Sequence, residues 1–228
     1  MVHFFDLQTN APNLYDHKDL FIQSILDTIE MLIKAGFFSF LVGIVFGVIL
    51  IITKKGGIKE NTVVNWLISQ VINFIRALPF IILLVLIKPI TYFIMGTTIQ
   101  VRGVIFPLIV GCSPFFIRQV EAALSDVDPG LIEAAQSMGL STFEIITKVY
   151  LRESIPALAR AVSITLISLL GLTTMGGAVG GGGIGDMVIT YGNNRNMYDI
   201  TLAAIPVILI IVLVIEIISK YVIKKTTH

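Results

Sequence analysis

This chain has 228 residues, of which 55% are hydrophobic and only 14% are charged, and its mean hydropathy is +0.91. A soluble domain of this size needs roughly a quarter of its residues charged to cover its surface. The composition therefore excludes an ordinary soluble domain and favours a protein that lies in a membrane. The formal net charge of +1 gives no bulk attraction for nucleic acid, so nucleic-acid binding is not expected.

The N-terminus, Met-Val-His-Phe-Phe-Asp, has neither the basic start nor the small-residue cleavage site of a signal peptide. The first apolar segment is therefore expected to remain as an anchor. The histidines His3, His17 and His228 are isolated from one another, so no metal site is predicted. The single cysteine, Cys112, is expected to be a small buried side chain.

Five apolar segments are near or above the roughly 20 residues that a helix needs to cross a bilayer. They lie at about 21–53, 62–87, 100–124, 156–175 and 200–222. The third is the weakest because it contains Pro107 and Pro114, and a buried or re-entrant helix is its alternative. The predicted fold class is an all-α, polytopic membrane protein with five transmembrane helices, in which residues 1–228 form a single transmembrane domain.

Lysine and arginine placement predicts the orientation of these segments. Ten basic residues fall on one side and four on the other. The ten are Lys54, Lys55, Lys59, Arg118, Lys148, Arg152, Arg160, Lys220, Lys224 and Lys225; the four are Lys18, Lys88, Arg102 and Arg195. The more basic side faces the cytoplasm, so the N-terminus is expected outside and the C-terminus inside. The connector at 125–155, called the elbow below, is then cytoplasmic.

Arg76 lies about thirteen residues into the second apolar segment, near the expected middle of the membrane. An intramembrane charge is by default a candidate for function. A structural role is the preferred alternative, because Pro79 leaves the Ile75 carbonyl without its helical donor and the guanidinium could bind that oxygen. No acidic partner is evident at a similar depth.

The elbow carries clear signals for two helices. Asp128 and Pro129 predict the start of the first, since aspartate caps free amides and proline suits the first turn. Gly139 is placed to end this helix in a left-handed conformation. Ser141 and Glu144 form a capping box that predicts the start of the second helix.

The first elbow helix has a narrow apolar stripe made of Leu131, Ala134, Ala135 and Met138. Its small alanines allow a partner's backbone to approach closely, and Glu133 offers a charge to basic or amide groups. These features predict a docking surface for another protein. The alternative is that the helix lies at the lipid headgroups, although it lacks the lysine and arginine enrichment that such helices show.

A glycine-rich run at 176–185 has seven glycines in ten residues. No Lys-Ser/Thr follows it, and it is predicted to lie at or just inside the external face, so it is not expected to be a phosphate-binding loop. Two interpretations remain open, a flexible re-entrant turn and a hinge or gate of a transport pathway. The candidate gate residues are Met175, Gly176, Gly177, Gly181, Gly182 and Gly183.

No nucleophile–base–acid set appears in the sequence, so the chain is not predicted to be an enzyme. A membrane-embedded enzyme is therefore disfavoured. A secondary transporter or channel is the main rival to a docked, partner-driven protein. It is disfavoured because no convincing repeat and no intramembrane acidic ion site is found.

The elbow sequence Glu133-Ala134-Ala135-x-x-x-Gly139 resembles the EAA loop of permease subunits in bacterial ABC importers, which enters a cleft on the ATP-binding subunit. In that family the motif continues to Ile-x-Leu-Pro. Here Val149-Tyr150-Leu151-Arg152 lacks the proline, and Pro156 is expected to supply the helix break.

Four further stretches look like the small, five-span permease of methionine-uptake importers. They are Arg76–Ile81, Pro114–Arg118, Gly130–Ala134 and Met175–Gly185, and the likeness covers roughly residues 62–225. The resemblance implies a homodimer in the bacterial cytoplasmic membrane that moves methionine (L- and/or D-) inward. Another small amino acid is the alternative substrate, and a secondary transporter is the less favoured alternative.

The same resemblance implies partners. Two cytoplasmic ATP-binding subunits would bind ATP and Mg²⁺, and an extracellular or periplasmic lipoprotein would bind methionine. The chain itself would hold no cofactor or metal. The residues implied to contact the ATP-binding subunit are Leu131, Glu133, Ala134, Ala135, Met138 and Gly139.

Overall fold

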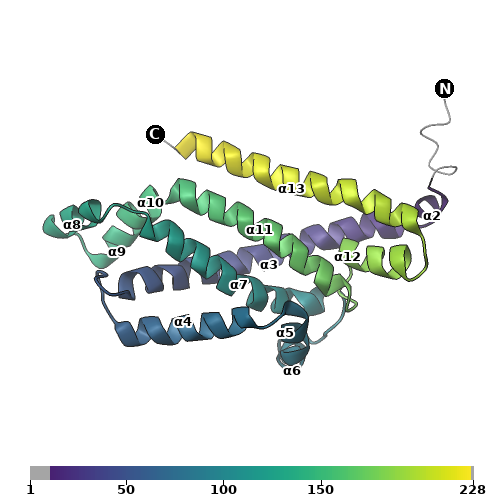
Figure 1. Cartoon of the computed structure of the whole chain (residues 1–228), viewed down its shortest axis with the longest axis horizontal. Coiled ribbons are helices and arrows are strands. Elements are labelled where there is room, and N and C mark those ends of the chain that lie inside the picture. Colours follow the sequence, from purple (N-terminus) through teal and green to yellow (C-terminus); the bar gives the residue numbers. More distant parts are fainter. Residues whose placement is uncertain (1–10, 227–228) are drawn as a thin grey trace. The chain divides into compact units, whose positions relative to one another are not determined.

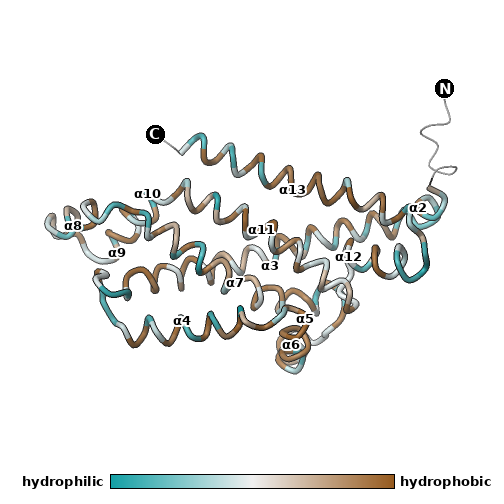
Figure 2. Tube along the Cα trace, in the orientation of Figure 1, coloured by the Kyte–Doolittle hydropathy of each residue, from teal (hydrophilic) through white to brown (hydrophobic). Residues whose placement is uncertain are grey.

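The computed structural model describes residues 11–226, so His3, His228 and the N-terminal hexapeptide considered above lie outside it. All regular structure in the described residues is helical, which confirms the predicted fold class. Within residues 11–226, four helices are long and apolar enough to cross a membrane (Figure 1). They are α3 (Lys18–Thr53), α7 (Gln100–Ser125), α11 (Ile155–Gly177) and α13 (Tyr198–Thr226). Figure 2 shows that hydrophobic residues dominate these helices, whereas α8 in the elbow mixes hydrophilic and hydrophobic residues.

The second predicted segment is not one helix. It consists of α4 (Thr62–Ala77) and α5 (Phe80–Leu86), which together are apolar and long enough for a span but are bent at the break between them. Leu78 and Pro79 both have extended backbone at this break. The pair is therefore a fifth, broken span or a re-entrant loop. Proline disfavours a helical conformation in the residue before it, and this explains why the helix stops at Ala77.

The third predicted segment is a continuous helix, although Pro107 and Pro114 lie within it. More than half of its most apolar window is buried, so the surrounding protein stabilises the backbone that proline interrupts. The re-entrant alternative is not what the structure shows. The fourth and fifth segments form α11 and α13, within a few residues of their predicted bounds.

Short helices that the apolar pattern did not predict lie before and between the long ones. They are α2 (Pro12–Asp16), α6 (Lys88–Met95), α12 (Gly183–Met187) and the π-helix η3 (Val188–Asn193). Proline occupies the first turn of both α2 and α6, where its missing N–H costs nothing. Gly96 ends α6 with a φ of 75°, the left-handed conformation that glycine adopts without strain.

The chain divides into two compact units. The first contains the residues up to Gly36 together with Pro79–Ile109 and Leu166–Ile215. One core of this unit forms where α3, α12 and the start of α13 meet. Its buried members are Phe21, Ile184, Met187, Ile200 and Ala204.

The second unit contains Phe37–Leu78, Val110–Thr165 and the residues from Glu216 onward. It holds the whole elbow, and its core joins the elbow to the adjoining ends of the long helices. The core residues are Ile51, Phe116, Val120, Leu124, Val127, Ala135, Ile145, Tyr150 and Ala161. Buried residues of the elbow therefore share one core with α3, α7 and α11.

Candidate functional site

The first helix of the elbow, α8 (Pro129–Ser137), begins as predicted. The Asp128 side chain accepts a hydrogen bond from the Gly130 amide at 2.8 Å, and Pro129 is the first helical residue. This bond satisfies one of the free amides that every helix start exposes. The start of α8 is thus fixed by neighbouring residues alone.

The end of α8 is a glycine corner. Gly139 has a φ of 76°, and its amide donates to the Gln136 carbonyl at 2.9 Å. The Leu140 amide donates to the Ala135 carbonyl at 3.1 Å. This pair of bonds is the Schellman motif, in which a left-handed residue closes the last helical turn. The predicted role of Gly139 in ending the helix is confirmed.

The capping box at the next helix is also present. The Ser141 hydroxyl accepts from the Glu144 amide, and the Glu144 carboxylate accepts from the Ser141 amide at 3.0 Å. Lys148, one turn later, donates to the same carboxylate at 2.8 Å. The hydrogen bond from Lys148, together with those from Ser141, lowers the pKa of Glu144 from 4.5 to about 2.

Beyond this cap the elbow departs from a regular α-helix. A short turn, α9 (Thr142–Glu144), leads into the π-helix η2 (Ile145–Tyr150) and then α10 (Leu151–Glu153). The Leu151 amide donates to the Ile146 carbonyl five residues earlier. Ile145 and Tyr150, also five residues apart, are both buried, so the wider helix places both on the core side. Burial raises the pKa of Tyr150.

The last helix of the elbow, α10, ends at Ser154, just before α11 begins at Ile155. Pro156 occupies the first turn of α11, which confirms its predicted place at the break. The buried Ser154 hydroxyl donates to the Ala123 carbonyl of α7 at 3.1 Å. This bond fastens the end of the elbow to the last part of α7.

Most of the predicted stripe on α8 is exposed to solvent. Leu131 and Met138 are 46% and 72% exposed, and Glu133 and Ala134 are exposed as well. Ala135 is buried, which corrects its predicted place on the contact surface. It packs in the core that holds α8 in place. Phe143, which the sequence analysis did not single out, is 74% exposed just past the glycine corner. We call the exposed set the docking face; it comprises Leu131, Glu133, Ala134, Met138 and Phe143.

A pocket of about 220 Å³ opens beside α8. Glu133 and Gln136 line it from α8, and Lys54 and Gly57 line it from the loop after α3. A charged side chain or amide from another protein would meet both a carboxylate and an ammonium group here. Exposed apolar side chains with an adjoining polar pocket are typical of a protein–protein contact.

The glycine-rich run forms a tight, hydrogen-bonded turn. The amides of Gly180 and Gly181 donate to the carbonyls of Gly177 and Gly176, each at 3.0 Å. Gly180, Gly182 and Gly183 have φ values of 82°, 74° and 78°, a conformation that other residues adopt only with strain. The turn therefore needs glycine for its backbone path.

Close packing adds a second requirement for glycine. Gly176, Gly177, Gly181 and Gly183 are buried, and Gly182 is partly buried. A Cβ added at Gly177 would collide with the backbone of 185–186, and one at Gly181 would collide with the Gly176 carbonyl. This packing argues against the interpretation of the run as a flexible turn. It leaves the interpretation as a gate open.

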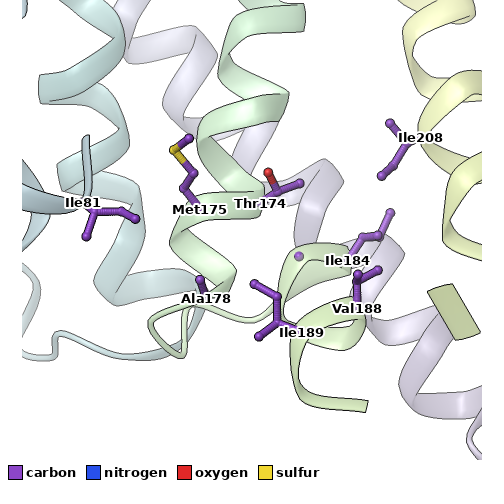
Figure 3. A pocket seen from close by; sticks show the side chains of 9 residues that line it. Ile81, Thr174, Met175, Ala178, Ile184, Val188, Ile189 and Ile208 are labelled. Atoms are coloured by element: carbon purple, nitrogen blue, oxygen red, sulfur yellow. The ribbon is translucent and has the colours of Figure 1, made fainter. Parts of the chain in front are cut away.

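Met175, the remaining candidate, is 46% exposed in a pocket of about 280 Å³ (Figure 3). Figure 3 shows its thioether on the side of α11 that faces Ile81, whereas the Thr174 side chain lies on the opposite side of this helix. The Thr174 hydroxyl donates to the Gly171 carbonyl of its own helix at 2.7 Å. The other lining residues are Ile81, Ala178, Ile184, Gly185, Val188, Ile189 and Ile208. The pocket offers apolar contact with no charged group among these residues.

Residues 25–228 match the family model described as the binding-protein-dependent transport system inner membrane component. The chain belongs to this family. The predicted resemblance to ABC-importer permeases is confirmed, and so is the expectation of a multi-pass inner-membrane protein that does not itself hydrolyse ATP. A secondary transporter is excluded.

Curated relatives show which permeases of this family the chain resembles. The chain is 43% identical over 214 residues to the probable D-methionine transport system permease protein MetI of Vibrio cholerae, covering 93% of this chain and 94% of that protein. It is 43% identical over 171 residues to the methionine import system permease protein MetP of Bacillus subtilis, covering 75% and 77%. The predicted likeness to methionine-uptake permeases is thereby confirmed.

The fold is also that of known transporters. A chain of the MetNI methionine ABC transporter, solved in inward-facing conformations, matches with a TM-score of 0.91 at 37% identity, covering 93% of this chain and 99% of that chain. An amino-acid ABC transporter with histidines matches with a TM-score of 0.74 at 17% identity, covering 95% and 98%. The second likeness concerns the fold alone.

Arg76 is exposed near the end of α4, and the preferred structural role is not seen. The Ile75 carbonyl accepts from the Leu78 amide at 3.2 Å, so it does not need the guanidinium. The described residues provide Arg76 with neither an ion pair nor a hydrogen-bond partner. Its side chain is therefore available to a group outside the described chain.

Two structural features escaped the sequence analysis. Phe143 follows the glycine corner at Gly139 and the capping residue Ser141. An aromatic residue in this polar connector could have indicated an exposed contact residue from the sequence alone. Thr28, in α3, contacts the glycine-rich turn through its hydroxyl. No local pattern marks that contact, because the partners are 156 residues apart.

Proposed function

We propose that this chain is the permease subunit of an ATP-driven importer that moves methionine, L- or D-, into the cell. Two copies would associate with two ATP-binding subunits, which hold ATP and Mg²⁺, and with an external methionine-binding lipoprotein. The observation that carries this proposal is the docking face on a rigidly capped elbow. The names of the similar relatives support methionine as the substrate.

The elbow is built to transmit movement. Ala135 and Ile145 pack in the same core as α3, α7 and α11, and Ser154 is bonded to α7. A push on the docking face therefore displaces the helix ends with it rather than bending a loop. Closure of the ATP-binding subunits would bring two elbows together and favour one arrangement of the permease over the other.

In this proposal all 228 residues act as one permease domain, with the N-terminus outside and the C-terminus inside. The glycine-rich turn and Met175 would form the external gate of the pathway. Arg76 would serve a functional rather than a structural role, which its lack of a partner in the described chain supports. Leu131, Glu133, Ala134, Met138 and Gly139 would act at the ATP-binding subunit, and Ala135 would hold α8 in position.

The substrate is tested by uptake of radiolabelled L-methionine into vesicles that contain the reconstituted complex. Unlabelled L-methionine and D-methionine are added as competitors, beside histidine, glutamine and a peptide. We expect the methionines to compete best. If histidine, glutamine or the peptide competes better, methionine is the wrong substrate and another amino acid or peptide takes its place.

The docking face is tested separately by co-purification with the ATP-binding subunit. Glu133→Arg reverses an exposed charge, and Gly139→Trp places a bulky side chain at the left-handed corner. Both variants should enter the membrane but lose the ATP-binding subunit. Glu153→Arg, the same charge reversal at an exposed position outside α8, is the matched control and should retain it. Retained binding in both docking-face variants would contradict this role of the elbow.

A further inference from the structure

Thr28 connects α3 to the glycine-rich turn through one hydroxyl group. Its Oγ1 donates to the Ser24 carbonyl at 2.9 Å and accepts from the Ile184 amide at 2.8 Å. Thr28 is 1% exposed and Ile184 is fully buried. The hydroxyl therefore uses both its donor and an acceptor site in a place that water does not reach.

The Ile184 amide depends on this hydroxyl. It lies in the first turn of α12, where backbone amides have no carbonyl one turn earlier to bind. A buried amide without an acceptor is strongly unfavourable, and Thr28 supplies the acceptor. No residue with a side chain can take the place of the preceding Gly183 and supply an acceptor itself. A Cβ there would lie 2.8 Å from the Thr28 hydroxyl and 2.7 Å from the Met31 methyl carbon.

The other end of the turn is held by backbone. The Gln100 amide, at the start of α7, donates to the Gly180 carbonyl at 2.8 Å. The turn is thus tied to α7 by a bond between backbone groups, and to α3 by a bond to a side chain. The bond to α3 is the one whose presence depends on the identity of a single residue.

We propose that Thr28 is a positioning residue of the external gate. Its hydroxyl latches the glycine-rich turn to the first membrane helix, so that the two move together during transport. This inference rests on the proposed function, because it assumes that the turn gates an ATP-driven pathway. It adds a named contact through which α3 takes part in gating.

Thr28→Val and Thr28→Ser separate the hydrogen bond from the packing. Valine keeps the shape of threonine but has no hydroxyl, and serine keeps the hydroxyl but loses a methyl group. In vesicles with the assembled complex, Thr28→Val should lower methionine imported per ATP hydrolysed by about tenfold, the factor that accompanies one lost hydrogen bond in a buried site. Thr28→Ser should stay close to the unsubstituted chain. A purely structural role would lower uptake and ATP hydrolysis together and leave their ratio unchanged.

Amide hydrogen exchange of the peptide around Ile184 is the second measurement. It needs only the assembled complex in detergent, so it remains informative when uptake is too low to measure. Thr28→Val should speed exchange at this peptide but not in the elbow, and Thr28→Ser should not. Equal ratios of uptake to ATP hydrolysis in all three proteins, or equal exchange, would overturn the latch. Methionine uptake by the unsubstituted complex tests the proposed function by itself. Failure of the proposed function can therefore be told apart from failure of the proposal for Thr28.

Discussion

The elbow and the glycine-rich turn both contain backbone amides and carbonyls outside regular helix, but these groups find their hydrogen-bond partners in different ways. The capping hydrogen bonds at Asp128, Gly139 and Ser141 in the elbow join residues that are at most five positions apart. The turn instead relies on Gln100 and on Thr28, which is 156 residues from its partner. The elbow is therefore a locally determined structure with a free outer surface. The turn is determined by its surroundings and has little space to change.

The largest effect is expected from Gly181→Val in the turn. The new side chain would collide with the Gly176 carbonyl and with Val104, and overpacking of this kind costs about 1–3 kcal/mol or more. We expect methionine uptake by the reconstituted complex to fall at least about tenfold, while the amount of protein in the membrane stays the same. Gly182→Val, at a φ of 74°, should behave similarly.

Gly171→Ala is the control for this substitution. Gly171 lies in α11, and a Cβ added there meets no atom within 4 Å. Uptake should remain within about twofold of the unsubstituted complex. Normal uptake by both Gly181→Val and Gly182→Val would show that the turn is not part of a gate.

A smaller effect is expected from Phe143→Ala on the docking face. Phe143 is 74% exposed, so its removal should leave the stability of the permease unchanged. Only a minority of interface residues cost more than about 1 kcal/mol when truncated, and aromatic residues are enriched among them. Phe143 is the aromatic residue of the docking face, so we expect affinity for the ATP-binding subunit to fall about tenfold. Tyr221→Ala, at a 68% exposed aromatic in α13, serves as the control in the same binding titration. Equal affinity in the two variants would remove Phe143 from the docking face.

Gly139→Ala compares the two regions directly. Gly139 shares the left-handed conformation of Gly183, with φ values of 76° and 78°, but a Cβ at Gly139 meets nothing within 4 Å. The cost is then only the left-handed backbone of alanine, about 1–2 kcal/mol. Thermal unfolding should detect this loss, and Gly183→Ala should be clearly more destabilising. A similar loss at both positions would mean that conformation, and not packing, sets the requirement for glycine in the turn.

The smallest effect concerns the pH dependence of the elbow. The pKa of Glu144 is lowered to about 2, chiefly by the hydrogen bond from Lys148, so the stabilisation exists above the ordinary pKa and is lost only as pH falls toward 2. We expect no change in the elbow between about pH 7 and pH 5. Carbon-13 NMR of the carboxyl group in detergent should show this low midpoint. Lys148→Ala should raise it, whereas Lys55→Ala, an exposed lysine that is not bonded to Glu144, should not. An unchanged midpoint in Lys148→Ala would contradict the assigned cause.

Local signals made most of the elbow predictable. An aspartate before a proline, a glycine after a helical stripe and a capping box each determine backbone over a few residues. The helical stripe alone did not show which side of α8 faces the core, so Ala135 was placed on the outer surface with Leu131 and Met138. The π-helix was also missed, because Ile145 and Tyr150 match a spacing of five only once their burial is known.

By itself the sequence determined the helical fold class, the long apolar segments, the caps of the elbow and the family resemblance. Each of these depends on residue type and on spacing along the chain. The tertiary structure decided the burial of Ala135 and the attachment of the glycine-rich turn to Thr28 and Gln100. These features depend on which distant residues share a core, and a buried amide or carbonyl accepts whichever partner the fold brings within reach.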